Sequence, residues 1–116
     1  GIPRVSEAAS LSDALVEMTQ KGLGMTVITG PDEQVMGVFT DGDLRRVLDH
    51  GEVNVRELNI ADCMIQNPKT IRPDQLAAEA LQLMDTKRIN ALPVVDEQHR
   101  LIGAINMHDL LRAGVV

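Results

Sequence analysis

The sequence predicts an α/β (α+β) fold built from two pseudo-symmetric repeats, each a small β-sheet packed with two helices, with the sheets packed face to face. A shift of 66 residues, as from Ala14 to Ala80, aligns the two halves without a gap. In each half, a stretch with helical periodicity precedes two apolar runs separated by polar turn residues. Because each repeat has one apolar sheet face to bury, we expect neither to fold well alone.

The identities between the halves fall at positions with the same expected structural role. They are Ala14 and Ala80, Leu15 and Leu81, Met18 and Met84, Lys21 and Lys87, Gly37 and Gly103, Asp43 and Asp109, Leu44 and Leu110, and Arg46 and Arg112. We expect a first repeat over residues 1–51, a connector over 52–69 that leads into the second repeat, and a second repeat over 70–116. The missing initiator Met suggests that the chain is excised from a longer protein.

The first element of each repeat is an amphipathic helix. Its apolar face is Leu11, Leu15 and Met18 in the first repeat, and Ser10 with Asp13 provides an N-terminal cap. The equivalent face in the second repeat is Ala77, Leu81 and Met84.

A β-hairpin and a second helix follow in each repeat. The predicted hairpin strands are 25–29 with 35–39, and 91–95 with 101–105. The predicted second helices are 41–50, closed by Gly51, and 107–112, closed by Gly114. The connector holds a short apolar segment at 60–64, and Asn67-Pro68 stops any helix there.

The composition limits the classes of molecule that the protein is expected to bind. The net charge of −6 and the pI of about 4.9 argue against nucleic acid, which requires clustered cations. The sequence has one Phe and no Trp or Tyr, so base stacking is nearly excluded as well. Phe39 lies in an apolar run and is expected in a core that aliphatic residues and six Met must fill.

Little in the sequence supports catalysis or metal binding. Cys63 is the single cysteine, lies in an apolar segment without a nearby His, and is expected in the core. The histidines His50, His99 and His108 are scattered, so we expect no metal site and no cofactor. With no disulfide, no apolar run long enough to span a bilayer and no signal-peptide pattern, the cytoplasm is the expected location.

The strongest local motif is a buried strand that ends in Thr40 as a helix begins, with Asp43 three residues later. One interpretation is a capping box, in which Thr40 and Asp43 satisfy the first free amides of the helix. The other is a ligand site, because a helix N-terminus favours phosphate and a carboxylate accepts hydrogen bonds from a ribose diol. Both use the same atoms. The second repeat echoes the motif with Asn106 and Asp109.

Cationic side chains flank both junctions and are candidates for anion recognition or for a solvated helix face: Arg45 and Arg46 at the first, His108 and Arg112 at the second. A further cationic pair, Lys87-Arg88, stands just before the strand that begins at Ala91, where it either points into the crevice between the repeats or is exposed. If the repeats close face to face, both junctions meet one crevice, which is the usual setting of a small-molecule site.

These motifs resemble a tandem pair of cystathionine β-synthase (CBS) domains, also called a Bateman module, over essentially the whole chain. The resemblance is carried by Asp62-Cys63-Met64, Asn67-Pro68-Lys69-Thr70-Ile71, Glu79-Ala80-Leu81, Leu92-Pro93-Val94-Val95-Asp96, and the Gly-x-x-Thr-x-x-Asp pattern that ends at Asp43. It implies that Thr40 and Asp43 hold the phosphate and ribose of a nucleotide. Asn106 replaces the hydroxyl residue at the second junction and Ile65 stands where the family often has Thr, which favours one asymmetric site.

The two strand-to-helix segments further resemble the C-terminal CBS pair of bacterial D-arabinose 5-phosphate isomerases. This implies a non-catalytic regulatory region, an absent N-terminal sugar isomerase domain, a homodimer of CBS pairs, and a nucleotide or nucleotide-sugar effector. The end product of the Kdo branch of lipopolysaccharide biosynthesis, CMP-Kdo, is the expected ligand. An AMP or ATP sensor and a ligand-free assembly module are the alternatives.

Overall fold

The computed structural model of the chain describes residues 2–51, 54–75, 77–87 and 89–107, with residues 77 and 87 described by their backbone alone. The chain divides into two compact units, residues 1–68 and 69–116. Each unit is described by itself below. The predicted connector of residues 52–69 therefore remains a prediction.

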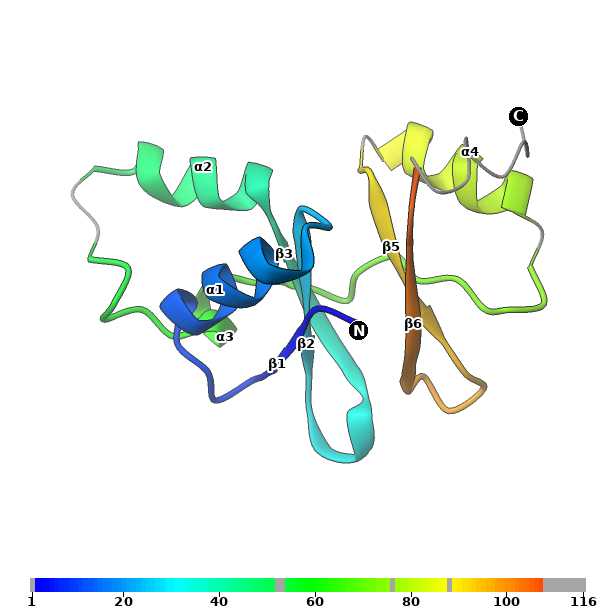
Figure 1. The fold of residues 1–116 in the computed structure, drawn as a ribbon, viewed down its shortest axis with the longest axis horizontal. Coiled ribbons are helices and arrows are strands. Elements are labelled where there is room, and N and C mark those ends of the chain that lie inside the picture. Colours follow the sequence, from blue (N-terminus) through cyan, green and yellow to red (C-terminus); the bar gives the residue numbers. More distant parts are fainter. Residues whose placement is uncertain (1, 52–53, 76, 88, 108–116) are drawn as a thin grey trace. The chain divides into compact units, whose positions relative to one another are not determined.

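Unit 1 is built on a four-stranded sheet in the order β1-β2-β3-β4 (Figure 1). The strands are β1 (Arg4–Ser6), β2 (Met25–Thr29), β3 (Val35–Thr40) and β4 (Ile65–Gln66). β1 pairs in parallel with β2, whereas β2 with β3 and β3 with β4 are antiparallel. The predicted hairpin is confirmed, with a short 3₁₀ turn, Pro31–Glu33, at its tip.

The helices in the described part of unit 1 are α1 (Leu11–Lys21), α2 (Asp41–Asp49) and the single turn α3 (Ile60–Cys63). Ser10 caps α1 as predicted, because its side chain accepts a hydrogen bond from the Asp13 N–H at 3.0 Å. The core contains Phe39, which is fully buried, together with residues from α1, β2 and α3. Its buried members are Leu11, Ala14, Met18, Ile28, Phe39 and Ile60. Leu15, also on the predicted apolar face, is half-buried and packs against this core, while Ala14 is fully buried.

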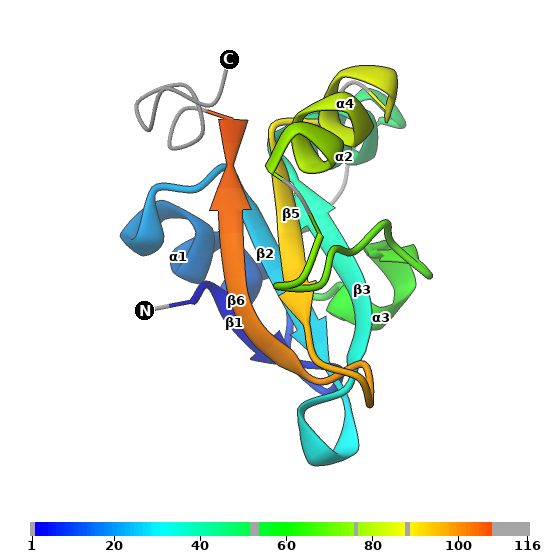
Figure 2. The same cartoon turned by 90° about the vertical axis from the view of Figure 1, so that its right-hand side faces the viewer.

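Unit 2 contains α4 (Ala77–Lys87) and a hairpin of β5 (Ala91–Val95) and β6 (Leu101–Asn106) (Figure 2). Its core is the buried set Ile71, Ala80, Met84 and Leu92. Met84 lies on the predicted apolar face, and Leu81 on the same face is half-buried. The predicted helix over 107–112 lies outside the described residues except for its first position.

The 66-residue repeat also relates details of strand pairing in the two units. The irregularity in the first hairpin lies between Ile28 and Thr29, and that in the second lies between Val94 and Val95, 66 positions later. The parallel pair Val5 with Ile28 has its counterpart in a single bridge between Ile71 and Val94. The predicted α/β fold with two repeats of small sheets and helices is therefore confirmed, while face-to-face packing of the sheets stays a prediction.

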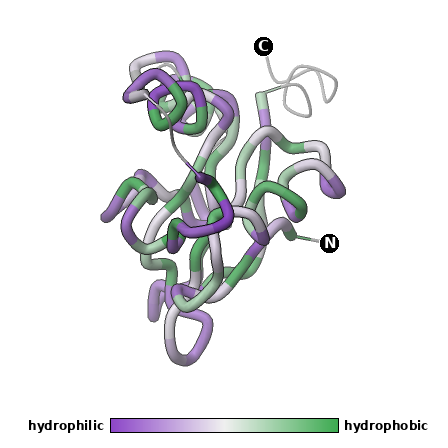
Figure 3. The backbone as a smooth tube through the Cα atoms, turned by 90° about the vertical axis from the view of Figure 1, so that its left-hand side faces the viewer, coloured by the Kyte–Doolittle hydropathy of each residue, from purple (hydrophilic) through white to green (hydrophobic). Residues whose placement is uncertain are grey.

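Hydropathy along the backbone agrees with these elements. In Figure 3 the helical turns alternate between hydrophilic and hydrophobic colours, as amphipathic helices do. Among the described residues no helix is both long and apolar enough to cross a membrane.

Candidate functional site

The junction between β3 and α2 carries the motif singled out in the sequence. Thr40 is extended, with φ −119° and ψ 170°, and forms the N-cap of α2. Its Oγ1 accepts from the Asp43 N–H at 3.2 Å, while the Thr40 N–H donates to Asp43 Oδ2 at 2.9 Å. The predicted capping box is therefore present, and it fixes both side chains relative to the helix N-terminus.

The Asp43 carboxylate is the most constrained group of the junction. It is 4% exposed, and Oδ2 also accepts the Thr40 hydroxyl at 3.0 Å. Oδ1 is paired with the guanidinium of Arg46, whose side chain is 67% exposed. Asp43 therefore offers a fixed acceptor for hydroxyl groups, whereas its partner Arg46 is exposed.

Gly42 lies beside the hydroxyl and the guanidinium of this junction. A Cβ added at Gly42 would lie 3.7 Å from Thr40 Oγ1 and 3.9 Å from the terminal nitrogens of Arg46. The absent side chain thus marks a position that adjoins both the hydroxyl and the guanidinium. Arg45 and Asp41 are exposed beside it, so the surface carries both signs of charge.

The second junction is described only in part. The Met107 N–H donates to the Asn90 carbonyl at 2.8 Å, as the Asp41 N–H donates to Gly24 at 3.2 Å. Asn106 therefore occupies the place of Thr40 at the end of its strand. The predicted site residues His108, Asp109, Arg112 and Arg88, and the side chain of Lys87, lie outside the described residues.

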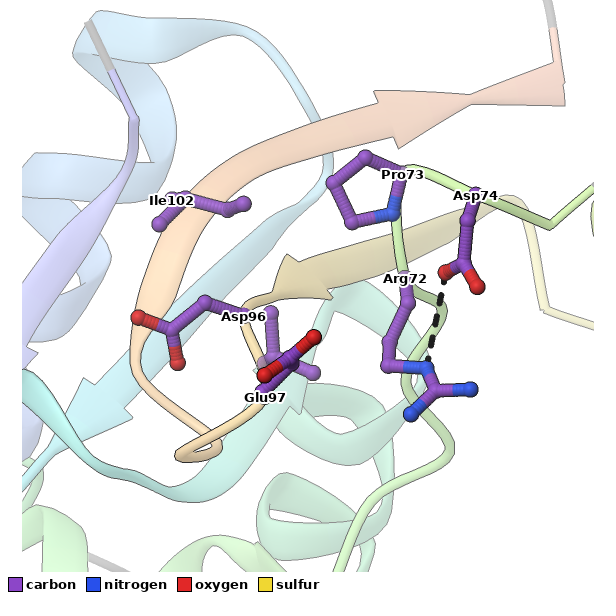
Figure 4. Close-up of a pocket in the computed structure, with 7 residues that line it drawn as sticks. Arg72, Pro73, Asp74, Asp96, Glu97 and Ile102 are labelled. Carbon is purple, nitrogen blue, oxygen red and sulfur yellow. Dashed lines mark ion pairs between the residues drawn. The ribbon is translucent and has the colours of Figure 1, made fainter.

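Two hollows lie elsewhere on the described surface. One, of about 330 Å³, belongs to unit 2 and is shown in Figure 4. It is lined by Arg72, Pro73, Asp74, Val95, Asp96, Glu97 and Ile102. The lining contains three carboxylates, those of Asp74, Asp96 and Glu97, and one cation, Arg72, which pairs with Asp74 at 3.5 Å. Because negative charge predominates, the hollow disfavours a phosphate. The other hollow, of about 410 Å³, lies on α1 around Leu15 and Val16.

The remaining candidates for chemistry in the sequence are Cys63 and groups of possible metal ligands. Burial, with a smaller contribution from the charge of Asp62, raises the pKa of the Cys63 thiol, which disfavours the reactive thiolate. Cys63 packs against the core but is half-buried rather than fully enclosed as expected. In the part of the chain that the structure describes, no cluster of His, Cys, Asp or Glu could hold a metal ion.

The family model for the CBS domain matches residues 1–50 and 55–116. The chain belongs to the CBS domain family. It is 53% identical over 116 residues to arabinose 5-phosphate isomerase KdsD of Pseudomonas aeruginosa and 55% identical over 115 residues to KdsD of Escherichia coli K12. The two matches include 100% and 99% of this chain, but the chain spans only 35% and 34% of the length of these relatives. It thus corresponds to their CBS part, as the sequence resemblance predicted.

A solved structure gives the same fold. The CBS pair superposes with a TM-score of 0.86 on a putative signal-transduction protein with CBS domains from Burkholderia ambifaria, at 26% identity. The match covers 99% of this chain and 83% of the other.

The structure brings together Thr40, Asp43 and Arg46 and places Arg45 exposed on the same helix. Sequence reasoning missed the pairing of Arg46 with Asp43, although their separation of three residues on one helix was a usable signal. It also missed Gly42, because the sequence does not reveal which side chains lie beside a glycine in the first turn of a helix.

Proposed function

We propose that this CBS pair is the regulatory region of an arabinose 5-phosphate isomerase and binds a nucleotide sugar, CMP-Kdo, at Thr40 and Asp43. Binding changes the activity of the attached isomerase domain because the ligand prefers one arrangement of the protein. The similarity to KdsD supports the parent enzyme, and the β3–α2 junction supports the site.

The observation that carries the proposal is the buried carboxylate of Asp43, which Thr40 holds in place and which pairs with the exposed Arg46. Ribose hydroxyls donate to Asp43, replacing the Arg46 contact, and the released guanidinium turns to the phosphate. Because the Arg46 side chain is largely exposed, this exchange disturbs no packing. The first-turn amides of α2 add positive potential for the same phosphate.

The charges around the junction support CMP-Kdo as the proposed ligand. CMP-Kdo carries one phosphate and one sugar carboxylate, and Arg45 and Arg46 supply a cation for each. His108, Asp109, Arg112, Lys87 and Arg88 complete the proposed set from the second repeat, with Asn106 in place of a hydroxyl. The proposal also places the protein in the cytoplasm, as a homodimer of CBS pairs.

Calorimetric titration with CMP-Kdo, AMP and ATP tests this proposal. We expect binding of CMP-Kdo that is at least about tenfold tighter than that of AMP or ATP, since each lost charged hydrogen bond changes affinity by about this factor. The variant Asp43→Asn keeps an acceptor for the capping contacts but loses the charge, and should bind CMP-Kdo at least about tenfold more weakly. Asp41→Asn, in the same turn but outside the capping box, is the matched control and should bind as well as the parent.

Two results would replace the proposal by its alternatives. Tight binding of AMP or ATP without binding of CMP-Kdo identifies an energy sensor. No heat with any nucleotide, together with a concentration-dependent mass in sedimentation that Thr40→Ala with Asp43→Ala alters, identifies an assembly module. Turnover of ribulose 5-phosphate by this chain alone would contradict the non-catalytic assignment.

A further inference from the structure

One side of α1 is exposed and carries no charged residue. A shallow hollow of about 410 Å³ on this side is lined by Ser12, Leu15, Val16, Thr19 and Gln20, which together are called the α1 face below. Val16 is 54% exposed, and Leu15 is half-buried. The charged residues of the helix recur every four positions along a different side and are Asp13, Glu17 and Lys21. Depletion of charge is typical of the centre of a protein interface.

The α1 face has no equivalent on the helix of the second repeat. A shift of 66 residues places Gln82 where α1 has Val16, and Asp85 where α1 has Thr19, and both residues of α4 are exposed. The Thr19 hydroxyl donates to the Leu15 carbonyl at 2.9 Å, so this donor is satisfied within the helix and needs no other partner. An exposed face without charge is therefore a property of α1 rather than of the repeated fold.

The start of the chain is held beside this helix. The Arg4 N–H donates to Glu17 Oε1 at 3.4 Å. Pro3 is fully buried, and its carbonyl accepts a hydrogen bond from β2 at 2.9 Å. Glu17 directly follows Val16 in the sequence and lies about one helical turn from Gln20. A domain that precedes this chain is therefore attached close to the α1 face.

The C-terminal end of α1 reaches the β3–α2 junction. Gly22 caps the helix in the left-handed conformation, with φ 67°, and Gly24 is also left-handed, with φ 71°. The Gly24 carbonyl accepts the Asp41 N–H at 3.2 Å, and a Cβ at Gly24 would lie 3.1 Å from Asp41 Oδ2. Asp41 is the first residue of α2. A partner bound to α1 thus contacts an element that is joined to the proposed ligand site.

We propose that the α1 face binds the isomerase domain that precedes the CBS pair in the parent protein. The relatives extend well beyond the part that this chain matches, which is 35% and 34% of their length. Covalent attachment through a short linker gives that domain a local concentration on the order of millimolar, so a small face is sufficient. A second copy of the chain lacks this advantage, and stable interfaces between separate proteins use roughly 20–30 residues a side. The inference rests on the proposed function only for the attached isomerase domain.

Maleimide labelling of Val16→Cys in the parent protein and in the 116-residue chain tests the inference. We expect labelling of position 16 to be at least about tenfold slower in the parent protein, which corresponds to a face that is covered for about nine tenths of the time. Gln82→Cys, at the equivalent position of α4, is the matched control and should be labelled at the same rate in both proteins. Peptide mass spectrometry distinguishes both positions from Cys63. The measurement uses no ligand, so failure of the CMP-Kdo proposal leaves it intact.

A charge placed on the α1 face should release the domain. Thr19→Lys adds a cation at an exposed position about one turn from Val16, and a charge without a partner is costly to bury. In the Val16→Cys parent protein this change should restore the labelling rate of the 116-residue chain. Asp85→Lys, at the equivalent position of α4, is the control and should leave the slow labelling unchanged.

A photoreactive maleimide attached to Val16→Cys identifies the occupant, and we expect cross-links to the isomerase domain of the parent protein. Three outcomes would overturn the inference. The first is an equal rate of labelling of Val16→Cys in the two proteins. The second is cross-linking to another CBS pair, with labelling of the 116-residue chain that slows as its concentration rises, which assigns the α1 face to a second copy. The third is slow labelling that persists in the parent protein with Thr19→Lys.

Discussion

Thr40 and Asp43 hold the N-terminus of α2 by reciprocal hydrogen bonds, and the same two side chains are the proposed ligand contacts. Stability and binding are therefore coupled at these positions, and their replacement by Ala tests both at once. Gly42 separates the two roles because it adjoins Thr40 and Arg46 without taking part in the capping box.

Gly42→Leu should weaken CMP-Kdo binding at least about tenfold while leaving the fold intact or slightly more stable. Leu is a better helix former than Gly by about 0.5–1 kcal/mol, and its side chain fills the space beside Thr40 Oγ1. Calorimetry and urea unfolding measure the two effects. Unaltered affinity would remove this face of the junction from the site.

Thr26→Val should stabilise the protein by about 1–2 kcal/mol in urea unfolding. Thr26 is fully buried, and its Oγ1 has no hydrogen-bond partner among the described residues, so Val removes an unsatisfied group at nearly constant shape. Val27→Thr, at an equally buried position of the same strand, is the reverse control and should destabilise. A destabilised Thr26→Val protein would mean that the hydroxyl has a partner in solution.

At the scale of elements, the described helices α1, α2 and α4 and both hairpins could be predicted because local pattern and packing agree. Leu11 and Met18 recur at helical spacing and do pack in the core, and Ser10 caps as a serine before such a run should. β4 could not be predicted, since Ile65 and Gln66 form a strand only through pairing with β3 from a distant part of the chain. Among the described residues, the Thr26 hydroxyl has no hydrogen-bond partner, and this could not be predicted either, because the sequence of an apolar strand does not show which groups a polar residue will meet.

The β5–β6 turn should make stability depend on pH. The Arg100 N–H, then its side chain and the Gln98 N–H, lower the pKa of Asp96 below its ordinary 3.8, against a smaller opposing effect of burial. A carboxyl with a depressed folded-state pKa stabilises above its unfolded pKa and loses that contribution as pH falls through the folded value. Asp96→Asn should therefore be less stable at pH 6, and the difference should shrink below about pH 4.

Urea midpoints of the two proteins at several pH values between about 6 and 2.5 measure this difference, a window that brackets the ordinary carboxyl pKa. Glu97→Gln, the adjacent exposed carboxylate, is the matched control and should follow the parent at every pH. A difference that stays constant with pH would show that the loss arises from the turn geometry rather than from the charge of Asp96.

For the whole molecule, the sequence repeat and the match to the CBS family model both indicate two related units. The first unit contains the capping motif of Thr40 and Asp43. The sequence identity to KdsD is the basis of our proposal that the chain regulates an isomerase. The candidate site was predictable as far as Thr40 and Asp43, because a hydroxyl and a carboxylate at this spacing define a helix start. The pairing of Arg46 and the position of Gly42 beside Thr40 and Arg46 depend on side-chain geometry that spacing alone does not fix.

The most direct test of the central claim is a nitrogen–proton NMR titration of the unmodified chain with CMP-Kdo, which requires no substitution at the capping box. We predict saturable shifts that are largest at the amides of residues 40–46. Shifts confined to residues around Arg72 and Glu97, or none at millimolar CMP-Kdo, would contradict the assignment of the ligand site to the β3–α2 junction.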